Sequence, residues 1–567
     1  MSHGFAENDH RSPRLRHGRS ALRCIATAMA SLLFGTLCLN AHEPPPASRF
    51  PQTSSNSPGS KPAGPTCSLA LELIDAKTGE PLPGIVQVLD AAGKGLELAV
   101  LVNRGQGIEE RGPIHRWWVS PKRTTITVPA APLTIKAVAG LETELATVHS
   151  DLTGKSWALV RVPLVRFAHA RRDGYVAGNT HLHLMKLSKP QADRYLREVP
   201  LADGLDIVFL SYLERAVADL EYTSNKYTPA DLERLAHEHV RFGHGEEHRH
   251  NFGSHDEGYG HILLLDIPLI VQPVSIGPGI TKKGPDSPPL QQGIDEARKA
   301  GGKVIWAHNS FGFEDIPNWL TDRVHANNIF DGGSHGSYKN TYYRYLNVGL
   351  HVPFSSGTDW FIYDFSRAYV MADRSLTPKE WLDRLAAGKS YITNGPLLEF
   401  TVDDRPLGSV LELTKPGDVA IRGRCTGRLD FKRIELMQDG QVVRTVASRK
   451  EGEHFVAQLN TKLSIDSPAW LALRTPPPPV KDDAELQEPV AENELGGPLF
   501  AHTSPIYVNL AGRGVFDRAT AEGLVAQMKA DLEKIQTQAV FDNETQRQRV
   551  AHVYQEAIEV LGTRLRP

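Results

Sequence analysis

The sequence predicts an α/β domain in the middle of the chain, with a small β-sandwich on each side and helices at the C-terminal end. In the middle, short apolar runs of the kind found in buried strands alternate with helical stretches. On both sides, apolar and polar residues alternate with the period of two that is typical of half-buried strands. The length of 567 residues also favours several domains over one.

Composition indicates a soluble globular protein. Hydrophobic residues make up 40% of the chain and charged residues 23%, which are ordinary values for a folded protein. The formal net charge is −3 and no long basic block occurs, so a nucleic-acid surface is not expected. The 23 histidines concentrate between His181 and His351. Histidine is the commonest transition-metal ligand near neutral pH, so this region is a candidate for a metal site.

Residues 1–41 predict a cleaved export signal. Five arginines precede an apolar run from Cys24 to Leu39, and Ala41 offers a small residue for cleavage. The run is shorter than the ~20 residues of a spanning helix, so cleavage is favoured over a membrane anchor. We therefore expect a periplasmic or secreted protein with no stable membrane span after cleavage. Cys67 and Cys425 would then remain, and an oxidising compartment allows a disulfide between them without the sequence indicating one.

The first folded region is expected at residues 67–168. The Pro- and Ser-rich residues 42–66 before it predict a disordered linker. From Cys67 onward, alternation is broken at Thr78-Gly79 and Pro83-Gly84, which predicts strand, turn and strand. Further alternation predicts a small antiparallel β-sandwich, which resembles the carboxypeptidase-regulatory type.

Residues 169–397 are expected to form the α/β domain. Most of the residues with metal-binding chemistry lie at or close to the ends of its strands, which is where α/β proteins gather catalytic residues. The runs that predict buried parallel strands are Ile207–Leu210, Ile262–Asp266 and Val304–Ala307, and the expected helices include Pro229–Arg241 and Pro288–Ala300.

Alternation returns after Pro396 and predicts a second β-sandwich at residues 398–512. The segment HTSPIYV at 502–508 is expected to be its last strand. Residues 513–567 are expected to form a helical tail, with Gly562 as the stop signal.

The sharpest chemical motif is His181-Leu182-His183. On a strand, residues i and i+2 point to the same face, so both imidazoles can approach one ion such as Zn²⁺. A second motif, residues 245–266, holds four acids and four histidines before its closing apolar strand. A solvated loop is the plain alternative for so polar a segment. Four histidines within fourteen residues instead favour ligation by at least two of its groups.

Two single residues follow buried strands further along the chain. They are His308 in VIWAHN and Asp359 in FSSGTDW. Taken alone, a histidine in such a place is commonly a hydrogen-bonded polar group and an aspartate is commonly a helix N-cap. Whether His308 and Asp359 have a functional role therefore depends on the other motifs.

The order of these motifs resembles the polymerase-and-histidinol-phosphatase (PHP) superfamily, most closely its carbaryl-hydrolase-like (CehA/McbA) branch. The motifs are HLH, GxE, a GH that leads into a strand, AH and GTD, and the tail AGKSYITNGPLLEF also looks like that branch. The resemblance covers about 70–510 and is strongest over about 175–410. It implies a distorted (β/α)₇ barrel with metals at the C-terminal ends of the strands.

The resemblance also implies a ligand set. His181, His183 and Asp359 would hold one ion, and His261 and His308 would hold a second. Glu247 would bridge the two ions, with Glu246 as the alternative if the register slips by one residue.

The chain departs from the family at two places. Ser211-Tyr212-Leu213 stands where the family has Thr-Asp-His, and Asp359-Trp360-Phe361 stands where it has Asp-x-His. Both missing histidines belong to a third metal, so we expect one or two divalent ions, zinc first and manganese or iron as alternatives. His248, His250 and His255 have no clear counterpart, and His250 is the best placed of them to assist.

The resemblance implies a metal-dependent hydrolase that cleaves an ester, amide or carbamate bond of a small-molecule substrate with a metal-activated water, and the N-terminal signal implies that it is exported. Asp359 and Glu247 would be catalytic, with Asp359 accepting the water's proton, and Arg249, His250 and Trp360 would contact substrate. The string Gly332-Gly333-Ser334-His335-Gly336 lacks the strand-to-helix context of a nucleophile elbow and is expected to be a loop.

Two alternatives stay open at this point. A phosphoesterase of the same fold would need basic residues near the metals, and Arg249 and Lys186 are candidates. A non-catalytic exported binding protein would use the domain only as a scaffold.

Overall fold

The computed structural model describes residues 64–214, 217–250, 258–277, 279–280, 284–308, 312–331, 337–372, 376–480 and 487–566. The predicted signal peptide, most of the predicted linker, His255 and the loop 332–336 lie outside these residues. In the part of the chain that the structure describes, no helix combines the length and the apolar character needed to cross a membrane.

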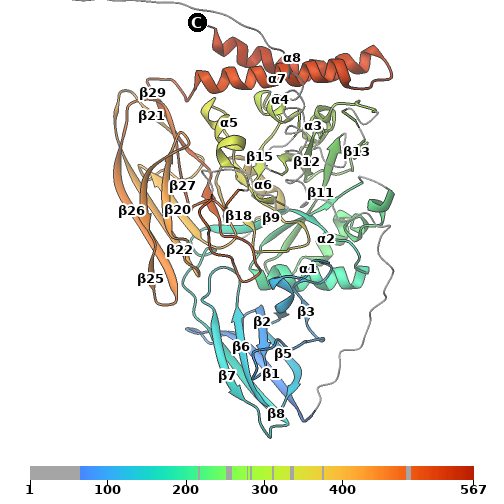
Figure 1. The fold of residues 1–567 in the computed structure, drawn as a ribbon, viewed down its shortest axis with the longest axis vertical. Coiled ribbons are helices and arrows are strands. Elements are labelled where there is room, and N and C mark those ends of the chain that lie inside the picture. Colours follow the sequence, from blue (N-terminus) through green and yellow to red (C-terminus); the bar gives the residue numbers. More distant parts are fainter. Residues whose placement is uncertain are drawn as a thin grey trace, which may run out of the picture. The chain divides into compact units, whose positions relative to one another are not determined.

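The described strands of the region expected as the N-terminal β-sandwich form two sheets (Figure 1). One has the order β5-β1-β8 and the other β3-β4-β2-β6-β7, and apolar side chains of both build one buried cluster that includes Cys67. The expectation of a purely antiparallel region is wrong, because β1 pairs with β8 in parallel. Alternation predicts which face of a strand is buried, but not the direction of its neighbour. The strands are β1 Thr66–Asp75, β2 Gly84–Leu89, β3 Val102–Asn103, β4 Trp118–Ser120, β5 Arg123–Pro129, β6 Pro132–Val138, β7 Ala146–Asp151 and β8 Trp157–Leu164.

The central sheet is built around β9, which is buried along its whole length. Pairing runs from β9 through β10, β11, β12, β14 and β15 to β16. β17 and β18 also pair with β9, and the Thr180 amide donates to the Ser356 carbonyl. The (β/α)₇ barrel class itself stays a prediction. The strands are β9 Tyr175–His183, β10 Ile207–Tyr212, β11 Arg241–His250, β12 Gly260–Leu265, β13 Ser275–Ile276, β14 Lys303–Trp306, β15 Ala326–Asn328, β16 Phe354–Ser355, β17 Asp359–Trp360, β18 Arg367–Met371 and β19 Ser390–Thr393.

Strand β12 runs antiparallel to both of its neighbours, β11 and β14. The run Ile262–Asp266 was expected as a parallel strand, so this expectation is wrong. Continuous apolar runs indicate burial on both faces, and β12 is buried throughout, but such runs carry no information on direction. The reversal matters for the site, because the start of β12 lies at the same sheet edge as the end of β11.

Helices connect the central strands. The α1 helix begins after the N-cap Ser188 and ends at Asp203, and Gly204 after it adopts a left-handed conformation that is costly for other residues. The α2 helix is shorter than the expected Pro229–Arg241, because the chain enters β11 at Arg241. On α6, the Trp381 indole nitrogen donates to the Val176 carbonyl, which fixes this helix against β9. The helices are α1 Lys189–Asp203, α2 Pro229–Leu235, α3 Leu290–Lys299, α4 Asp315–Leu320, α5 Arg344–Asn347 and α6 Pro378–Ala386.

The C-terminal strands form a four-stranded sheet, β20-β22-β26-β25, and a second set that joins the central sheet. The expected last strand at 502–508 is divided into β28 and β29 around Ser504-Pro505. β28 pairs with β27 and also with β19 of the central sheet. The strands are β20 Leu397–Val402, β21 Val410–Leu413, β22 Gly417–Gly427, β23 Arg433–Gln438, β24 Gln441–Ala447, β25 Arg449–Glu451, β26 His454–Ile465, β27 Ala469–Arg474, β28 Ala501–Thr503 and β29 Ile506–Leu510.

The chain ends in two antiparallel helices, α7 (Arg518–Gln538) and α8 (Glu544–Leu565), which lie side by side in Figure 1. Arg518 at the start of α7 donates to the Leu565 carbonyl at the end of α8. The expected stop at Gly562 is wrong, since α8 continues through it. A glycine inside a helix costs only about 1 kcal/mol, which packing against α7 offsets.

Candidate metal centre

The HxH pair lies at the end of β9, where both histidines point to one face. Their Nε2 atoms are 2.9 Å apart and both side chains are fully buried. The Nδ1 atom of His181 donates to the Asp331 carboxylate at 2.7 Å, and that of His183 donates to the Ser211 carbonyl at 3.0 Å. Because a carbonyl and a carboxylate only accept, these bonds fix the Nδ1–H tautomers of the neutral rings. The two Nε2 lone pairs then face each other, an arrangement that favours a cation between them.

Glu247 brings a carboxylate to the same point from β11. Its Oε2 lies 3.0 Å from His183 Nε2 and 3.5 Å from His181 Nε2. Side chains alternate along a strand, so Glu246 points to the opposite face, where it accepts from the Val271 amide at 2.9 Å and contacts His248. Of the two candidate glutamates, the structure therefore brings Glu247 to the histidines.

Asp359 completes the group, and its position depends on Gly357. A Cβ at residue 357 would lie 2.5 Å from the His181 Cβ, so only glycine lets the two segments approach closely. The Thr358 amide then donates to the His181 carbonyl, and Asp359 adopts a left-handed φ of 56°. Such a backbone costs about 1–3 kcal/mol and is typical of functional sites.

The Asp359 carboxylate is fully buried, and its Oδ1 lies 3.4 Å from His181 Nε2 and 3.5 Å from His183 Nε2. Among the described residues, neither of its oxygens accepts a hydrogen bond. A buried carboxylate without donors is strongly unfavourable unless a cation lies beside it. Asp359 therefore gives an independent indication of a cation site.

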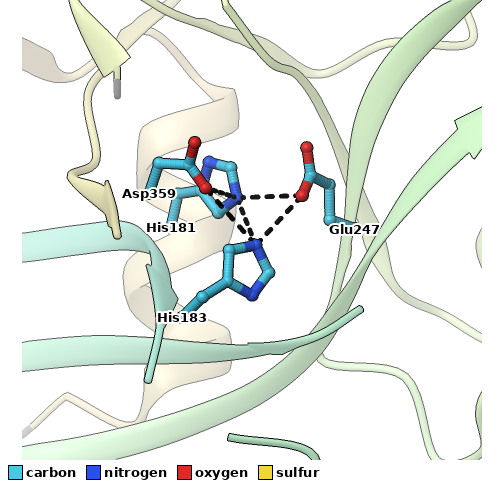
Figure 2. Close-up of side chains that lie close together, drawn as sticks. All are labelled: His181, His183, Glu247 and Asp359. Atoms are coloured by element: carbon cyan, nitrogen blue, oxygen red, sulfur yellow. Dashed lines mark hydrogen bonds and ion pairs between the residues drawn. The ribbon is translucent and has the colours of Figure 1, made fainter. Parts of the chain in front are cut away.

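These four residues form what we call the cage: His181, His183, Glu247 and Asp359 (Figure 2). The closest nitrogen and oxygen atoms of the cage are 2.9–3.5 Å apart in the five contacts given above. Ligands at ~2.0–2.1 Å from a tetrahedral ion lie ~3.3–3.4 Å apart, so the cage has the size of a zinc-type site. The buried cage can therefore hold a metal ion.

A second group shares Glu247 with the cage and adds His261 and His308. Glu247 Oε1 lies 3.2 Å from His308 Nε2 and 3.6 Å from His261 Nδ1. His261 is the second residue of β12, and the reversed direction of that strand brings it to the same edge as Glu247. All six residues expected as ligands thus lie in the two groups.

Asp331 also belongs to the site, although its sequence context did not predict this. Its carboxylate lies between the two groups, 2.7 Å from His181 Nδ1 and 3.8 Å from His308 Nδ1, and it accepts from Asn328 Nδ2 at 2.9 Å. A carboxylate behind a ligating histidine fixes the ring and makes it a stronger ligand. The available signal was its place just after β15, but that strand consists of Ala326, Asn327 and Asn328 and has no apolar pattern.

The electrostatics of the cage favour an added positive charge. Burial alone would lower the pKa of His181. Three neighbouring carboxylates outweigh burial and raise this pKa well above its usual value: Asp331, Asp359 and Glu247. Burial would raise the pKa of Glu247, but the Arg249 guanidinium and His181 hold it well below its usual range. The same field that retains a proton on His181 also attracts a metal ion.

Of the three residues expected to contact substrate, the structure brings two to the cage and places the third away from it. Trp360 is partly buried, and its ring centroid lies 5.0 Å from that of His183. Arg249 is fully buried, with its Nε 2.8 Å from Glu247 Oε1. His250 lies on the opposite face of β11, where its ring is 5.4 Å from that of His248, so the structure does not bring it to the cage.

The two positions where the family has third-metal histidines are apolar and buried here. Leu213 is fully buried, and Phe361 contacts the Tyr195 ring and packs where a Cβ on Gly107 would clash. Of the other residues named above, Lys186 is exposed and pairs with Glu109, and the ring of His351 stacks on Tyr507. Cys67 and Cys425 are both buried and free.

No protein-family model, curated protein or solved structure matches the chain. The resemblance to the PHP superfamily stays a prediction from the motifs. The geometry of the described residues by itself leads to a buried site that can hold a metal ion.

Proposed function

We propose that the protein is an exported metal-dependent hydrolase that cleaves an ester, amide or carbamate bond of a small-molecule substrate. The observation that carries the proposal is the convergence of four buried ligand atoms at metal-binding distances, beside a second histidine pair that shares Glu247. We assign one or two divalent ions to these groups, with zinc first because histidine and carboxylate ligands suit it. Export follows from the signal predicted at residues 1–41.

When bound, a divalent ion supplies a water of lowered pKa as nucleophile and polarises the bond that is attacked. The residues of the chain do the rest. Asp359 accepts the proton of the attacking water and passes it to the leaving group, so that water is added across the cleaved bond. Asp331 and the Ser211 carbonyl hold the two cage histidines in their tautomers. Trp360, which is only partly buried, forms the side from which substrate arrives.

The phosphoesterase alternative has less support. It needs basic side chains free to hold a phosphate, whereas Lys186 pairs with Glu109 and Arg249 pairs with Glu247. One observation does favour the non-catalytic alternative. Four protein ligands complete a tetrahedron, and this is the coordination of structural zinc sites, while catalytic sites keep one position open.

The test is a substrate panel for the purified protein. Aryl esters, carbamates, amides and phosphodiesters are offered with Zn²⁺ and with Mn²⁺. We expect turnover of carbonyl substrates that stops on chelation and returns with metal. Turnover of phosphodiesters alone would favour the phosphoesterase, and bound metal without any turnover would favour the non-catalytic protein.

A variant pair makes this test specific for the cage. The double change His181→Ala with His183→Ala should bind no metal and should fall below about a tenth of the wild-type rate, because the ion loses two ligands. His351→Ala is the matched control, since this histidine is exposed and stacks on Tyr507. A double variant that keeps its activity would refute the assignment.

A further inference from the structure

Arg249 lies on the same face of β11 as Glu247, two residues further along the strand. Its side chain is fully buried, and its Nε lies 2.8 Å from Glu247 Oε1. The guanidinium carbon is 6.0 Å from the centre of the Trp360 ring. A buried guanidinium at this distance from a carboxylate is a fixed positive charge within the site.

The two oxygens of Glu247 have different neighbours. Oε2 faces the cage, 3.0 Å from His183 Nε2 and 3.5 Å from His181 Nε2. Oε1 faces the second group and is the atom that Arg249 holds. A second ion bound between His261 and His308 would need this same oxygen as a ligand. Such an ion would lie close to the guanidinium. The ion and the guanidinium are both positive, and two positive charges that lie this close repel each other strongly inside a protein.

The buried charges balance with one ion. Around the cage, the three carboxylates of Glu247, Asp359 and Asp331 carry −3 and the Arg249 guanidinium carries +1. With neutral histidines, as metal ligation requires, this leaves −2, which one divalent ion cancels. Two divalent ions would leave +2 in a fully buried site, and buried uncompensated charge is strongly unfavourable.

We propose that Arg249 takes the place of a second metal ion: it holds Glu247 with Oε2 towards the cage and limits the site to one ion. The inference rests on the proposed metal site. It makes Arg249 a positioning residue for Glu247, and it leaves His261 and His308 as polar groups beside the cage and not as ligands of a second ion.

The experiment measures metal stoichiometry, which does not depend on activity. Full-length protein is loaded with excess Zn²⁺, freed of unbound metal and assayed for zinc per chain. We expect about one ion for wild type and about two for Arg249→Met, because the long apolar side chain keeps the volume and removes the charge. Arg249→Lys keeps the charge and should stay near one. Arg241→Met is the matched control, because Arg241 opens the same strand with an exposed side chain.

Wild type with about two ions per chain would overturn the inference and leave the proposed function standing. A folded Arg249→Met variant that stays at one ion would overturn it as well. Should this variant fail to fold, titration of metal-free wild type with Co²⁺ decides: one tetrahedral equivalent supports the inference and two overturn it. Wild type that binds no metal would refute the proposed function, and this inference with it.

Discussion

The side chain of Asp331 lies behind the cage and faces a histidine of each ligand group. It accepts from His181 Nδ1 at 2.7 Å and lies 3.8 Å from His308 Nδ1. With His181 and His308 it also forms a group that could hold an ion, and it belongs to neither of the groups that contain Glu247. Because it accepts from His181 Nδ1, we expect its effect on the cage to act through the ring of His181.

Replacing Asp331 by Asn tests this indirect role. The amide oxygen can still accept a hydrogen bond but carries no charge, so His181 becomes a weaker ligand. We expect metal affinity to fall about 10–100-fold, as for other partners of ligating histidines. Competition with a chelator of known affinity measures the change. Asp383→Asn is the control, because Asp383 lies on α6 and pairs with lysines at the surface; an equal loss in both variants would contradict the assignment.

Single residues differ in how far the sequence reveals them. The spacing of His181 and His183 was sufficient to predict that both point to one site, because residues two apart on a strand share a face. The role of Asp331 could not be predicted from the sequence, since it depends on a contact with a histidine 150 residues earlier in the chain. His250 was expected to assist, and strand alternation places it on the face of β11 that points away from the cage.

Among the elements, β11 departs most from sequence expectation. Its residues from Glu246 to His250 are all charged or histidine, and all are buried. Apolar periodicity is the main sequence signal for a strand, and this segment has none. It is buried because its two polar faces each meet a partner: Glu247 meets the cage histidines, and Glu246 meets the Val271 amide.

Two substitutions on β11 test its register. Glu247→Gln keeps the shape but removes the charge from the cage, so bound metal should fall well below that of wild type. Glu246→Gln changes the same atoms on the opposite face and should keep the wild-type metal content. Elemental analysis of both proteins measures the difference. A loss of metal from Glu246→Gln alone would mean that the register is shifted by one residue.

The start of α3 contains a pH-sensitive contact. The buried carboxylate of Glu314 accepts from the amides of Leu290 and Gln291 at 3.1 and 3.0 Å. Burial raises the pKa of Glu314 to about 7, although these bonds favour the charged form. Since the folded-state pKa lies above the unfolded value, the protonated form stabilises the fold. This contribution is complete below about pH 4.5 and is lost as pH rises through about 7.

Urea unfolding at pH 5 and pH 8 should therefore show a loss of stability with rising pH of up to about 3 kcal/mol from this group. Glu314→Gln cannot titrate, so its stability should change less between the two pH values. Glu296→Gln, on the exposed side of α3, serves as the control and should behave like wild type. The interpretation fails if Glu314→Gln and wild type show the same pH dependence.

For the whole molecule, metal removal tests whether the cage contributes to stability. Without an ion, the buried carboxylates of Glu247 and Asp359 face each other across the histidine pair. A ligand that binds only the folded state stabilises it, so chelation should lower the melting temperature by roughly 2–5 °C. Scanning calorimetry with and without chelator measures the shift. The double His181→Ala, His183→Ala variant should show none, and a shift of equal size in that variant would point to metal bound elsewhere.

For the molecule as a whole, the sequence predicts where strands form better than which strands pair and in which direction. The runs that became β10 and β14 were expected, because burial and length are local properties. The direction of β12 and the parallel pairing of β1 with β8 were not expected. Which strands pair depends on contacts between segments that are far apart in the sequence. The same holds for β28, which lies in the region expected as a separate sandwich and yet pairs with β19.

This pairing limits how such a protein can be assembled from interchangeable modules. A genetic exchange that kept the residues up to Pro396 and replaced the rest would remove β28, and β19 would lose its neighbour on one side. An unpaired strand edge is a template for pairing with other chains, so we expect such a hybrid to aggregate. The central region and the strands after it would therefore have to be exchanged together, although the sequence pattern changes between them.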